Sequence, residues 1–446
     1  MPSHALLIEA SDVLFSRDAI PMSAGQGKGA GARLPFPSTL HEAFRASLLL
    51  ARGERPSGKS VPGRPRKAIR KGNWHETNRA TDINIATKSF RSLQTVGPLP
   101  FLTEARSKSS APLGLYLPVP LDAALQSADS PVSPRQLARL RLLRDPSVAA
   151  TATAGRSLRN QTSLLPCLPV ATTPPDKHGT PRGWWTVPQY RAYLEGRPLP
   201  AGGSFDAMST DELWQPEHRI GVQIDPNSFA AADRQLYAAT VLRPHVGLRF
   251  ACEARLNQPH DSEEEELTAL DWLLLGGEQR LARLTPASPF ASLPVPPGVI
   301  GDGPCLLSWS LVTPAIFTQG HIPGWCVDTS TNSAGVARPP GFVCLRLPGR
   351  ARLIAACLGR PQTVSGWDTV EQKPKSTMLA VPAGSVFYFL CESAATGTEL
   401  ARVLHWRPRS DFYGEKGCGY GLCSFAIKLH RTSPDLRALA SELLTN

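Results

Sequence analysis

A stretch of turn and strand residues near the C-terminal end places the tightest constraint on the fold. It opens with a Gly-containing turn at Ser365-Gly366, passes Trp367-Asp368, and continues through Lys373-Pro374-Lys375. Val381–Gly384 (VPAG) then turns the chain into Ser385–Leu390, a run of β-branched and aromatic residues. Because such a run fits a pleated, half-buried strand, the stretch predicts strand, turn and strand, with cations on the connection.

Length and charge narrow the class of protein. A chain of 446 residues is long enough to divide into two or more domains. The net charge of +11 favours a polyanionic partner. The charge is uneven, because Arg52–Ser110 holds 13 Lys or Arg against four Asp or Glu, a surplus of nine.

The cysteines and the apolar runs indicate an intracellular chain. The nine cysteines form no CxxC pair, so reduced thiols are the simplest interpretation. No apolar run approaches the roughly 20 residues that a membrane-spanning helix needs, and no signal peptide is evident. Cys418 and Cys423 with His405 or His430 do not match the spacing of structural zinc sites. We therefore expect a soluble cytoplasmic protein without a metal or cofactor.

The first 50 residues predict a strand, a glycine-rich loop and a helix. Ala5–Ala10 suits a buried strand, and Lys28 lies among alternating glycines that would let a phosphate approach the backbone. An ordinary mobile loop explains those glycines equally well. Ser38 is a suitable N-cap for a helix that contains Leu40, Phe44 and Leu48, and a helix N-terminus can hold an anion.

The middle of the chain is the least regular part. Arg52–Lys71 is too polar to bury a face, which predicts disorder until a partner binds. Trp74 near Arg79 suits base stacking beside phosphate contacts, although a solvated loop is the alternative. Arg135–Arg144 predicts a short amphipathic helix, equally compatible with domain packing and with RNA contact.

The second half predicts mainly strands. We expect them at 218–225, 235–243, 247–254, 278–284, 305–312, 353–358 and 422–429. The acidic run 261–266 predicts a helix start, with that helix ending at Gly276-Gly277. Val187–Glu195 predicts another helix, ended by Gly196. The chain loosens around Gly202–Met208, where we place a domain boundary.

One nucleotide-binding motif is rejected on its context. Gly53–Ser60 (GERPSGKS) matches the P-loop pattern letter for letter. That pattern works only between a strand and a helix. Here a helix precedes it, and Pro62 and Pro65 prevent one after it. Nucleotide hydrolysis at this motif is therefore not expected.

The order GWD, KPK, VPAGSV and aromatic residues resembles one known family. It is that of the RAMP-superfamily subunit that caps the guide-RNA 5′ handle in type III-B CRISPR (Cmr) effector complexes. The N-terminal strand with Arg17-Asp18, the Pro37-Ser38-Thr39 turn, Gly276-Gly277 and the C-terminal Gly417–Gly421 are also similar to that family. His41-Glu42 departs from it, since relatives commonly have a small residue there.

The resemblance implies an α+β fold of two ferredoxin-like (RRM-like) RAMP domains. These would be residues 1–205, with a long basic insertion at about 52–180, and residues 206–446. It also implies a thumb protruding from the insertion, which would wedge apart guide and target. The implied function is non-catalytic: gripping the repeat-derived handle of the guide RNA in antiviral defence.

The resemblance and the charge pattern together give the candidate RNA-binding residues. Phosphates would be held by cations, by helix-start hydroxyls and by glycine amides, while Trp74 and Tyr420 would stack on bases. The full set is Arg17, Lys28, Arg33, Ser38, Thr39, Arg64, Arg66, Lys67, Arg70, Lys71, Trp74, Arg79, Gly277, Arg280, Lys373, Lys375, Lys416, Gly417, Gly419, Tyr420 and Gly421. Implied partners are guide RNA (crRNA), through it target RNA, a large polymerase-like subunit and a repeating backbone subunit, with no membrane.

Two other functions stay open at this point. A guide-RNA-processing endoribonuclease of the same superfamily would use a histidine such as His41 or His4. A protein-interaction scaffold would use the basic loops to grip acidic neighbours and would not touch RNA. Sequence cannot bring a base and a nucleophile together in space, so no catalytic residue is assigned.

Overall fold

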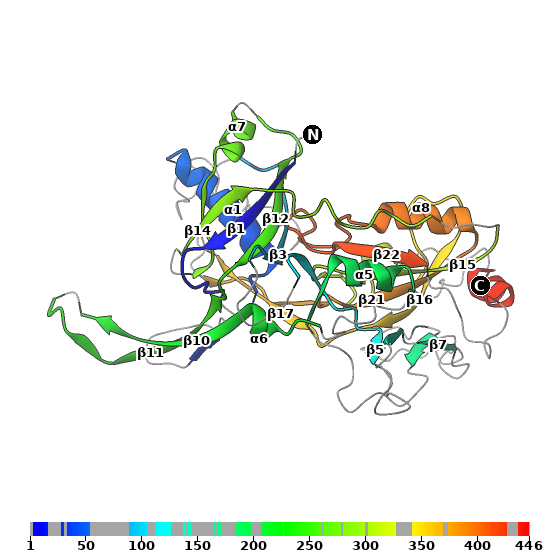
Figure 1. Cartoon of the computed structure of the whole chain (residues 1–446), viewed down its shortest axis with the longest axis horizontal. Coiled ribbons are helices and arrows are strands. Elements are labelled where there is room, and N and C mark those ends of the chain that lie inside the picture. Colours follow the sequence, from blue (N-terminus) through cyan, green and yellow to red (C-terminus); the bar gives the residue numbers. More distant parts are fainter. Residues whose placement is uncertain are drawn as a thin grey trace, which may run out of the picture.

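A computed structural model provides the structure of the chain (Figure 1). It describes residues 3–16, 28–30, 34–53, 89–104, 112–125, 137–139, 141–144, 165, 167–170, 183–197, 207–225, 227–260, 262–277, 280–298, 302–326, 341–368, 373–425 and 436–445. These residues form a mixed α and β structure whose two larger sheets are both antiparallel.

The first sheet joins strands from both halves of the sequence. Within the described ranges its order is β13-β14-β1-β12-β3-β4-β9. Ile8 of β1 lies between Phe250 of β12 and Leu284 of β14, and all three side chains are buried. The bounds are β1 His4–Ala10, β3 Leu93–Leu102, β4 Gly114–Pro118, β9 Trp184–Thr186, β12 Leu248–Leu256, β13 Trp272–Leu274 and β14 Leu281–Pro286.

This sheet crosses the domain boundary that the sequence predicted. Strands β12, β13 and β14 lie after residue 206, yet they pair with each other or with β1 and β3 from the N-terminal part. A division between residues 205 and 206 would therefore cut through one hydrogen-bonded sheet.

Helix α1, Pro37–Ala51, packs on the first sheet through one apolar face. Leu40, Phe44 and Leu48 recur every four residues, and each is fully buried. The N-cap is Phe36, so the prediction of Ser38 as N-cap is wrong. Pro37 is compatible with the first helical position because its missing N–H would have no helical partner there, which leaves Ser38 inside the first turn.

The second sheet forms the other large core. Its order is β16-β21-β15-β22, with bounds β15 Cys305–Leu311, β16 Ala351–Cys357, β21 Val386–Cys391 and β22 Gly421–Phe425. The strands predicted at 305–312, 353–358 and 385–390 are thus confirmed. Helix α8, Ala394–Leu404, buries Leu400 and Leu404 in this core, and Ser393 caps it by accepting from the Thr396 amide. Helix α9 spans Leu436–Thr445.

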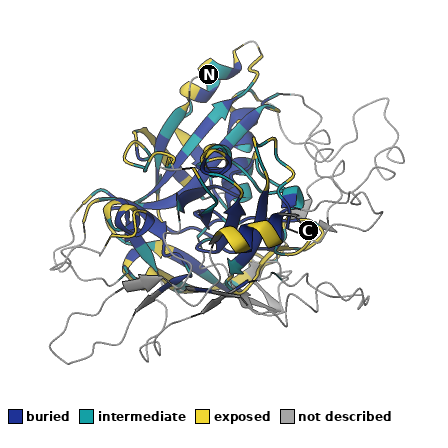
Figure 2. Cartoon of the chain, turned by 90° about the vertical axis from the view of Figure 1, so that its right-hand side faces the viewer, coloured by how far each residue is buried: buried dark blue, intermediate teal, exposed yellow. Residues whose placement is uncertain are grey.

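A third cluster of buried side chains lies between the two sheets. Leu117 of β4 and Trp185 of β9 pack in it with Val312 and Leu422 from the second sheet's side. Figure 2 shows dark-blue buried residues throughout the strands at the centre of the molecule. The two sheets therefore share a continuous interior.

Asp122 ties the two sheets together within that interior. Its carboxylate accepts a 2.5 Å hydrogen bond from Tyr193 and another of 2.5 Å from Tyr388 of β21. Tyr193 belongs to α5, Val187–Leu194, which ends at Glu195 and is followed by Gly196 at φ +65°. The predicted helix and its glycine end are thus confirmed.

A long hairpin protrudes from the first sheet's side of the molecule (Figure 1). It consists of β10, Trp214–Ile224, and β11, Ala231–Pro244, and β2, Lys28–Ala30, pairs parallel to β11. This protruding hairpin lies outside the 52–180 insertion from which a thumb was predicted. Arg219 and Arg243 at its base both form ion pairs with Asp12 and Glu217.

The predicted helix at Arg135–Arg144 is wrong. Leu137–Arg139 is strand β6, paired with β5 at Ala123–Leu125, and Arg141–Arg144 is β7, paired with β8 at Cys167–Val170. Leu142 is buried in a cluster beside the second sheet. Strand pairing and this burial override a helical pattern of only ten residues, which is marginal alone.

The acidic run starts a much shorter helix than predicted. Helix α7 covers only Glu263–Thr268, because Trp272–Leu274 joins the first sheet as β13. The stretch 365–390 is more finely divided than the predicted strand, turn and strand. Lys373–Pro374, expected on the connection, forms strand β19 and pairs with β18, Trp367–Asp368. Strand β20, Met378–Ala380, pairs with β17, Gln362–Val364, just before the stretch. Helix α6, Thr210–Leu213, and a 3-10 turn at Gly324–Cys326 complete the described elements.

Candidate functional site

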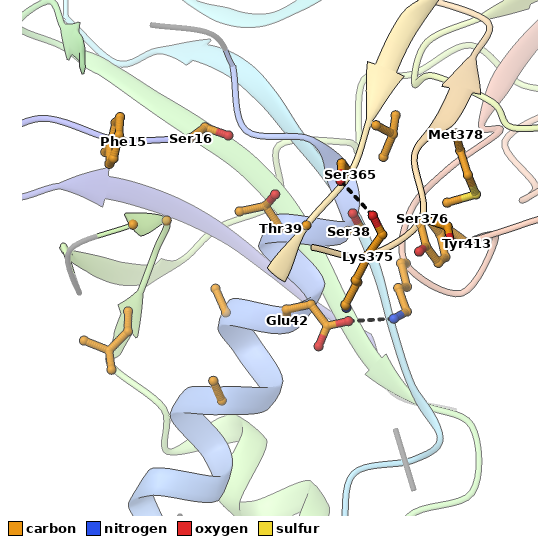
Figure 3. Close-up of a pocket in the computed structure, with 18 residues that line it drawn as sticks. Phe15, Ser16, Ser38, Thr39, Glu42, Ser365, Lys375, Ser376, Met378 and Tyr413 are labelled. Carbon is orange, nitrogen blue, oxygen red and sulfur yellow. Dashed lines mark hydrogen bonds and ion pairs between the residues drawn. The ribbon is translucent and has the colours of Figure 1, made fainter. Parts of the chain in front are cut away.

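A pocket of about 320 Å³ lies between segments that adjoin the first sheet and loops on the side of the second sheet (Figure 3). The segments that adjoin the first sheet are the start of α1, the end of the segment after β1, and the turn that follows β13. The side of the second sheet contributes three loops. The lining residues are Phe15, Ser16, Ser38, Thr39, Glu42, Ala43, Ala46, Leu274, Gly276, Gly277, Val364, Ser365, Gly366, Lys375, Ser376, Met378, Tyr413 and Lys416.

Five of the predicted RNA-binding residues lie together in this pocket: Ser38, Thr39, Gly277, Lys375 and Lys416. They come from four segments that are far apart in the sequence. Their convergence depends on the packing of the two sheets. Their role as RNA contacts stays a prediction.

The N-terminal turn of α1 forms one wall. Ser38 and Thr39 lie on it, and its first turn contains no acidic side chain. The aligned peptide dipoles give this end of a helix partial positive charge. The wall therefore favours an anionic group at the level of Ser38.

A buried ion pair lies one turn deeper. The Lys416 ammonium is 2.6 Å from a Glu42 carboxylate oxygen, and their side chains are 5% and 35% exposed. Burial, the largest influence, acts to raise the pKa of Glu42, but the neighbouring cationic groups, led by Lys416, together outweigh it and hold that pKa well below its usual range. Glu42 is thus an ionised carboxylate that still faces the pocket.

Lys375 approaches from the second sheet's loops. Its backbone N–H donates to the Gly366 carbonyl at 2.7 Å, and the Ser365 hydroxyl donates to the Lys375 carbonyl at 3.1 Å. These bonds fix the loop position from which the partly exposed side chain reaches the pocket (Figure 3). Its charge is a further cause of the lowered pKa of Glu42.

The two glycines at the turn after β13 allow close packing against Phe15. Gly276 has φ +84°, and a Cβ there would lie 2.5 Å from the Phe15 carbonyl oxygen. The Gly277 N–H donates to the same oxygen at 2.7 Å. Gly277 therefore shapes the pocket wall, and its amide is already used within the chain.

The glycine run Gly417–Gly421 is not the exposed phosphate-binding loop that the sequence predicted. The amides of Gly417, Cys418 and Gly419 donate to the carbonyls of Gly414, Tyr413 and Pro314. A Cβ on Gly419 would overlap the Ser410 amide nitrogen, and one on Gly421 would overlap the Trp309 side chain. The glycines allow the backbone to pack closely against its own chain, which leaves those amides no hydrogen for a phosphate.

Tyr420 is also buried, with only 3% of its surface exposed. Its ring makes an edge-on contact with Trp406, with 5.5 Å between centroids. The ring is thus enclosed by the protein itself, and its stacking on a base stays a prediction. The sequence pattern of an aromatic residue beside glycines is the same whether its ring contacts an RNA base or a neighbouring tryptophan.

The other predicted residues lie elsewhere. Arg280 lies just before β14 and is not among the pocket-lining residues. Lys28 and Lys373 are described only by their backbone, in β2 and β19. The remaining predicted RNA-binding residues lie outside the described residues: Arg17, Arg33, Arg64, Arg66, Lys67, Arg70, Lys71, Trp74 and Arg79.

Two important pocket residues were missed as site candidates. Glu42 follows Ser38 by four residues, so both occupy one face of α1, and this spacing was the available signal. Tyr413 has φ +60°, an uncommon value for a non-glycine residue, and its ring lies 5.0 Å from the Lys416 ammonium. Nothing in the sequence around Tyr413 indicated this geometry.

His41, one of the two histidines proposed for an RNA-cleaving alternative, is buried in the first core. Only 3% of its surface is exposed, and its Nδ1 lies 3.3 Å from the Thr95 hydroxyl. Burial, followed by the Lys416 charge, lowers the pKa of His41 to about 3. A neutral, enclosed imidazole is poorly placed to exchange protons with an RNA.

In the part of the chain that the structure describes, no three His, Cys, Asp or Glu residues are grouped to hold a metal ion. None of the described helices is long and apolar enough to cross a membrane.

Several solved structures are similar to the chain at low identity. Two are type III-B Cmr-beta complexes bound to cognate target RNA, one also with AMPPnP, at 13% and 12% identity and TM-scores of 0.36 and 0.37. Each match covers 86% of both chains. A Csm3-Csm4 subcomplex of a type III-A CRISPR-Cas interference complex matches at 9% identity and a TM-score of 0.36, covering 87% of this chain and 94% of that one.

The family assignment depends on a model of a protein family. No curated protein matches the chain by sequence. The family model of the CRISPR-associated protein Cas_Cmr3 matches residues 6–427. That range contains both sheets apart from the first two residues of β1, together with the hairpin and every residue of the pocket. The chain therefore belongs to the Cmr3 family of CRISPR-associated proteins.

Proposed function

We propose that the chain is a non-catalytic RNA-binding subunit of a type III CRISPR effector complex, and that it grips the 5′ repeat-derived handle of the guide RNA and caps the complex. Membership of the Cmr3 family supports its place in such a complex. The observation that carries the proposal is the pocket, where a helix N-terminus and Lys375 converge. Helix dipoles and ammonium groups both stabilise phosphate.

The proposed partners are those of an RNA-guided assembly in the cytoplasm. They are the guide RNA, through it the target RNA, the large polymerase-like subunit and the repeating backbone subunit. The net charge of +11 supports a polyanionic partner. Single-stranded RNA bound through phosphates and stacking should show steep salt dependence.

Two ferredoxin-like domains form part of the proposal. In the first sheet, the order β14-β1-β12-β3 with α1 after β1 and α7 after β12 is that of a β-α-β-β-α-β unit. The second sheet has the matching order β22-β15-β21-β16, with α8 before β22. This order favours a boundary between β14 and β15, at about residues 287–304.

The β10–β11 hairpin is proposed as the thumb that separates guide from target. Ile220, Val222 and Ile224 alternate along one face of β10, and they are 74%, 37% and 51% exposed. Phe229 at the turn is 83% exposed. Exposed apolar side chains on a protruding ribbon can insert between bases, where stacking compensates their contact with water.

The proposal is tested by removing one pocket cation. Lys375→Gln should weaken binding of a handle RNA by about fivefold, and it should reduce the salt slope by about 0.7, the value for one phosphate on a single strand. Arg402→Gln, on the exposed face of α8, is the matched control and should change neither. Fluorescence anisotropy across salt concentrations measures both. Equal slopes for all three proteins would remove Lys375 from the RNA site.

The basic insertion can be tested in the same assay. Reversing the charges of Arg64, Arg66, Lys67, Arg70 and Lys71 together should make RNA affinity depend less steeply on salt concentration. Each of these cations, if it contacts a phosphate, releases counterions from the RNA, and the variant would lose this effect. An unchanged slope would show that this segment does not contact the RNA.

The same purified protein distinguishes the two alternatives. Incubation with repeat RNA without metal should leave the RNA intact, whereas discrete cleavage that is lost in His41→Ala would favour an endoribonuclease. Complex that purifies without nuclease-sensitive absorbance at 260 nm would favour a scaffold that does not touch RNA.

A further inference from the structure

The pocket contains a carboxylate, which a surface for phosphates alone would not need. Glu42 has one oxygen 2.6 Å from Lys416, yet its side chain remains 35% exposed and lines the pocket. A phosphate placed against Glu42 would be repelled, since both groups are negative. The part of the pocket near Glu42 therefore suits a hydrogen-bond donor of the ligand, while Lys375 and the start of α1 suit its phosphate.

We propose that this pocket holds one guanine base of the bound RNA, whose N1–H and 2-amino group donate to the Glu42 carboxylate. The inference rests on the proposed function, since it names the base that the RNA site selects. Protein side chains commonly read unpaired RNA bases on their Watson–Crick edges. A carboxylate accepts two parallel hydrogen bonds in a planar arrangement.

Guanine is the RNA base that fits such an acceptor. Its Watson–Crick edge places two N–H donors side by side. Adenine and cytosine each present one amino group beside a ring nitrogen that accepts, and uracil presents one N–H between two carbonyls. In those three bases an acceptor lone pair would face the ionised carboxylate, which costs binding energy and gives discrimination.

The surroundings of Glu42 keep it an acceptor. Burial alone would raise its pKa, but the Lys416 ammonium and the nearby Lys375 keep the pKa of Glu42 well below its usual range. Lys416 is itself 5% exposed and held in place beside the Tyr413 ring. The pair is therefore a fixed acceptor at neutral pH.

The size and walls of the pocket suit one base. Its volume of about 320 Å³ lies at the small end of the range for ligand pockets. Tyr413 and Met378 are partly buried pocket residues that can contact the face of a planar ring. Figure 3 shows Glu42 and Lys375 extending toward the same space from opposite sides.

The test uses the full chain and short RNAs of defined sequence. The probes are an eight-nucleotide oligoadenylate and eight derivatives, each with one guanosine at a different position. One position should bind about tenfold more tightly than oligoadenylate, as expected for a bidentate base contact. Inosine at that position should lose most of the gain, because it lacks the 2-amino group.

Variants connect the preference to Glu42. Glu42→Gln should remove the guanine preference, measured as the ratio of the affinities for the guanosine-containing RNA and for oligoadenylate, since an amide offers one acceptor and not two. Glu266→Gln, which alters a carboxylate ion-paired with Arg52 away from the pocket, should keep the preference. Circular dichroism checks that each variant folds, and the inosine comparison on the unaltered chain does not depend on any variant.

The outcomes separate this inference from the proposed function. If none of the RNAs binds, the proposed function is wrong and the guanine site with it. If the RNAs bind but guanosine, inosine and adenosine bind alike, or Glu42→Gln keeps the preference, the RNA site stands and the guanine inference is overturned. Glu42 would then serve only to neutralise Lys416.

Discussion

Residues of the pocket and of the glycine run Gly417–Gly421 were both predicted to bind RNA, but only the pocket residues line an accessible cavity. Lys416 lines the pocket, while the next residue starts a run whose amides bond within the chain. Glycines permit positive φ and close backbone approach, but the approaching group can be a phosphate or the protein itself. The comparison teaches that a glycine pattern predicts close contact without identifying the partner.

The largest expected effect tests the structural role of the glycine run. Gly419→Ala should lower the free energy of unfolding by about 3 kcal/mol or more, because φ +79° is unfavourable for alanine and the Cβ overlaps Ser410. Gly320→Ala, with φ +71° and open space around it, should cost only about 1 kcal/mol. Urea unfolding followed by tryptophan fluorescence measures both. Equal losses would show that the run is not closely packed.

The buried ion pair gives the next largest effect. Lys416→Met should lower the free energy of unfolding by about 2 kcal/mol. This is less than the roughly 3–5 kcal/mol lost when a fully buried pair is broken, because Glu42 is partly exposed. This deficit should shrink as the pH falls below 4.5. The depressed pKa of Glu42 contributes stability above its ordinary value of 4.5, and this is lost as the pH falls toward the folded pKa. Arg402→Met, at an exposed pair, should leave the melting temperature unchanged; a similar loss there would argue against a special role for Lys416.

His41 should make the first core acid-sensitive. Its pKa is lowered from 6.5 to about 3, so below pH 6.5 the unfolded chain gains a proton that the folded chain does not. Stability should therefore fall by about 1.4 kcal/mol per pH unit between these values. His41→Gln should reduce that slope, and His218→Gln, at an exposed position, should not. Parallel slopes in all three proteins would contradict the buried, neutral state of His41.

The smallest effect separates the two tyrosines. Tyr413→Asn should weaken RNA binding by about fivefold, at the lower end of values for one stacked base, and asparagine tolerates the positive φ at this site. Tyr420→Phe, in the buried glycine run, should leave RNA affinity unchanged. Anisotropy with the same handle RNA measures both. If Tyr420→Phe weakened RNA binding and Tyr413→Asn did not, the glycine run and not the pocket would be the RNA site.

Most of the secondary structure followed from local patterns. Leu40, Phe44 and Leu48 predicted α1, and the apolar runs predicted β1, β15, β16 and β21. The failures occurred where a short pattern was overruled by distant partners. Leu142 lies in a strand because β8 pairs with it and a cluster beside the second sheet buries it.

The candidate site was predicted only in part. Ser38, Thr39, Gly277, Lys375 and Lys416 were named from the sequence and lie in one pocket. Glu42 was noted only as a departure from the family pattern. Its importance comes from Lys416, which is 374 positions away in the sequence. No local sequence pattern could predict a contact between residues so far apart in the chain.

The sequence by itself determined most of the element types, the basic character and the family resemblance, because periodicity, charge and motif order are local properties of the chain. Tertiary structure alone decided that β12 to β14 complete the first sheet, that the glycine run faces inward, and that Glu42 meets Lys416. The physical reason is that burial and pairing depend on which surfaces meet, and the two sheets bring together segments hundreds of residues apart.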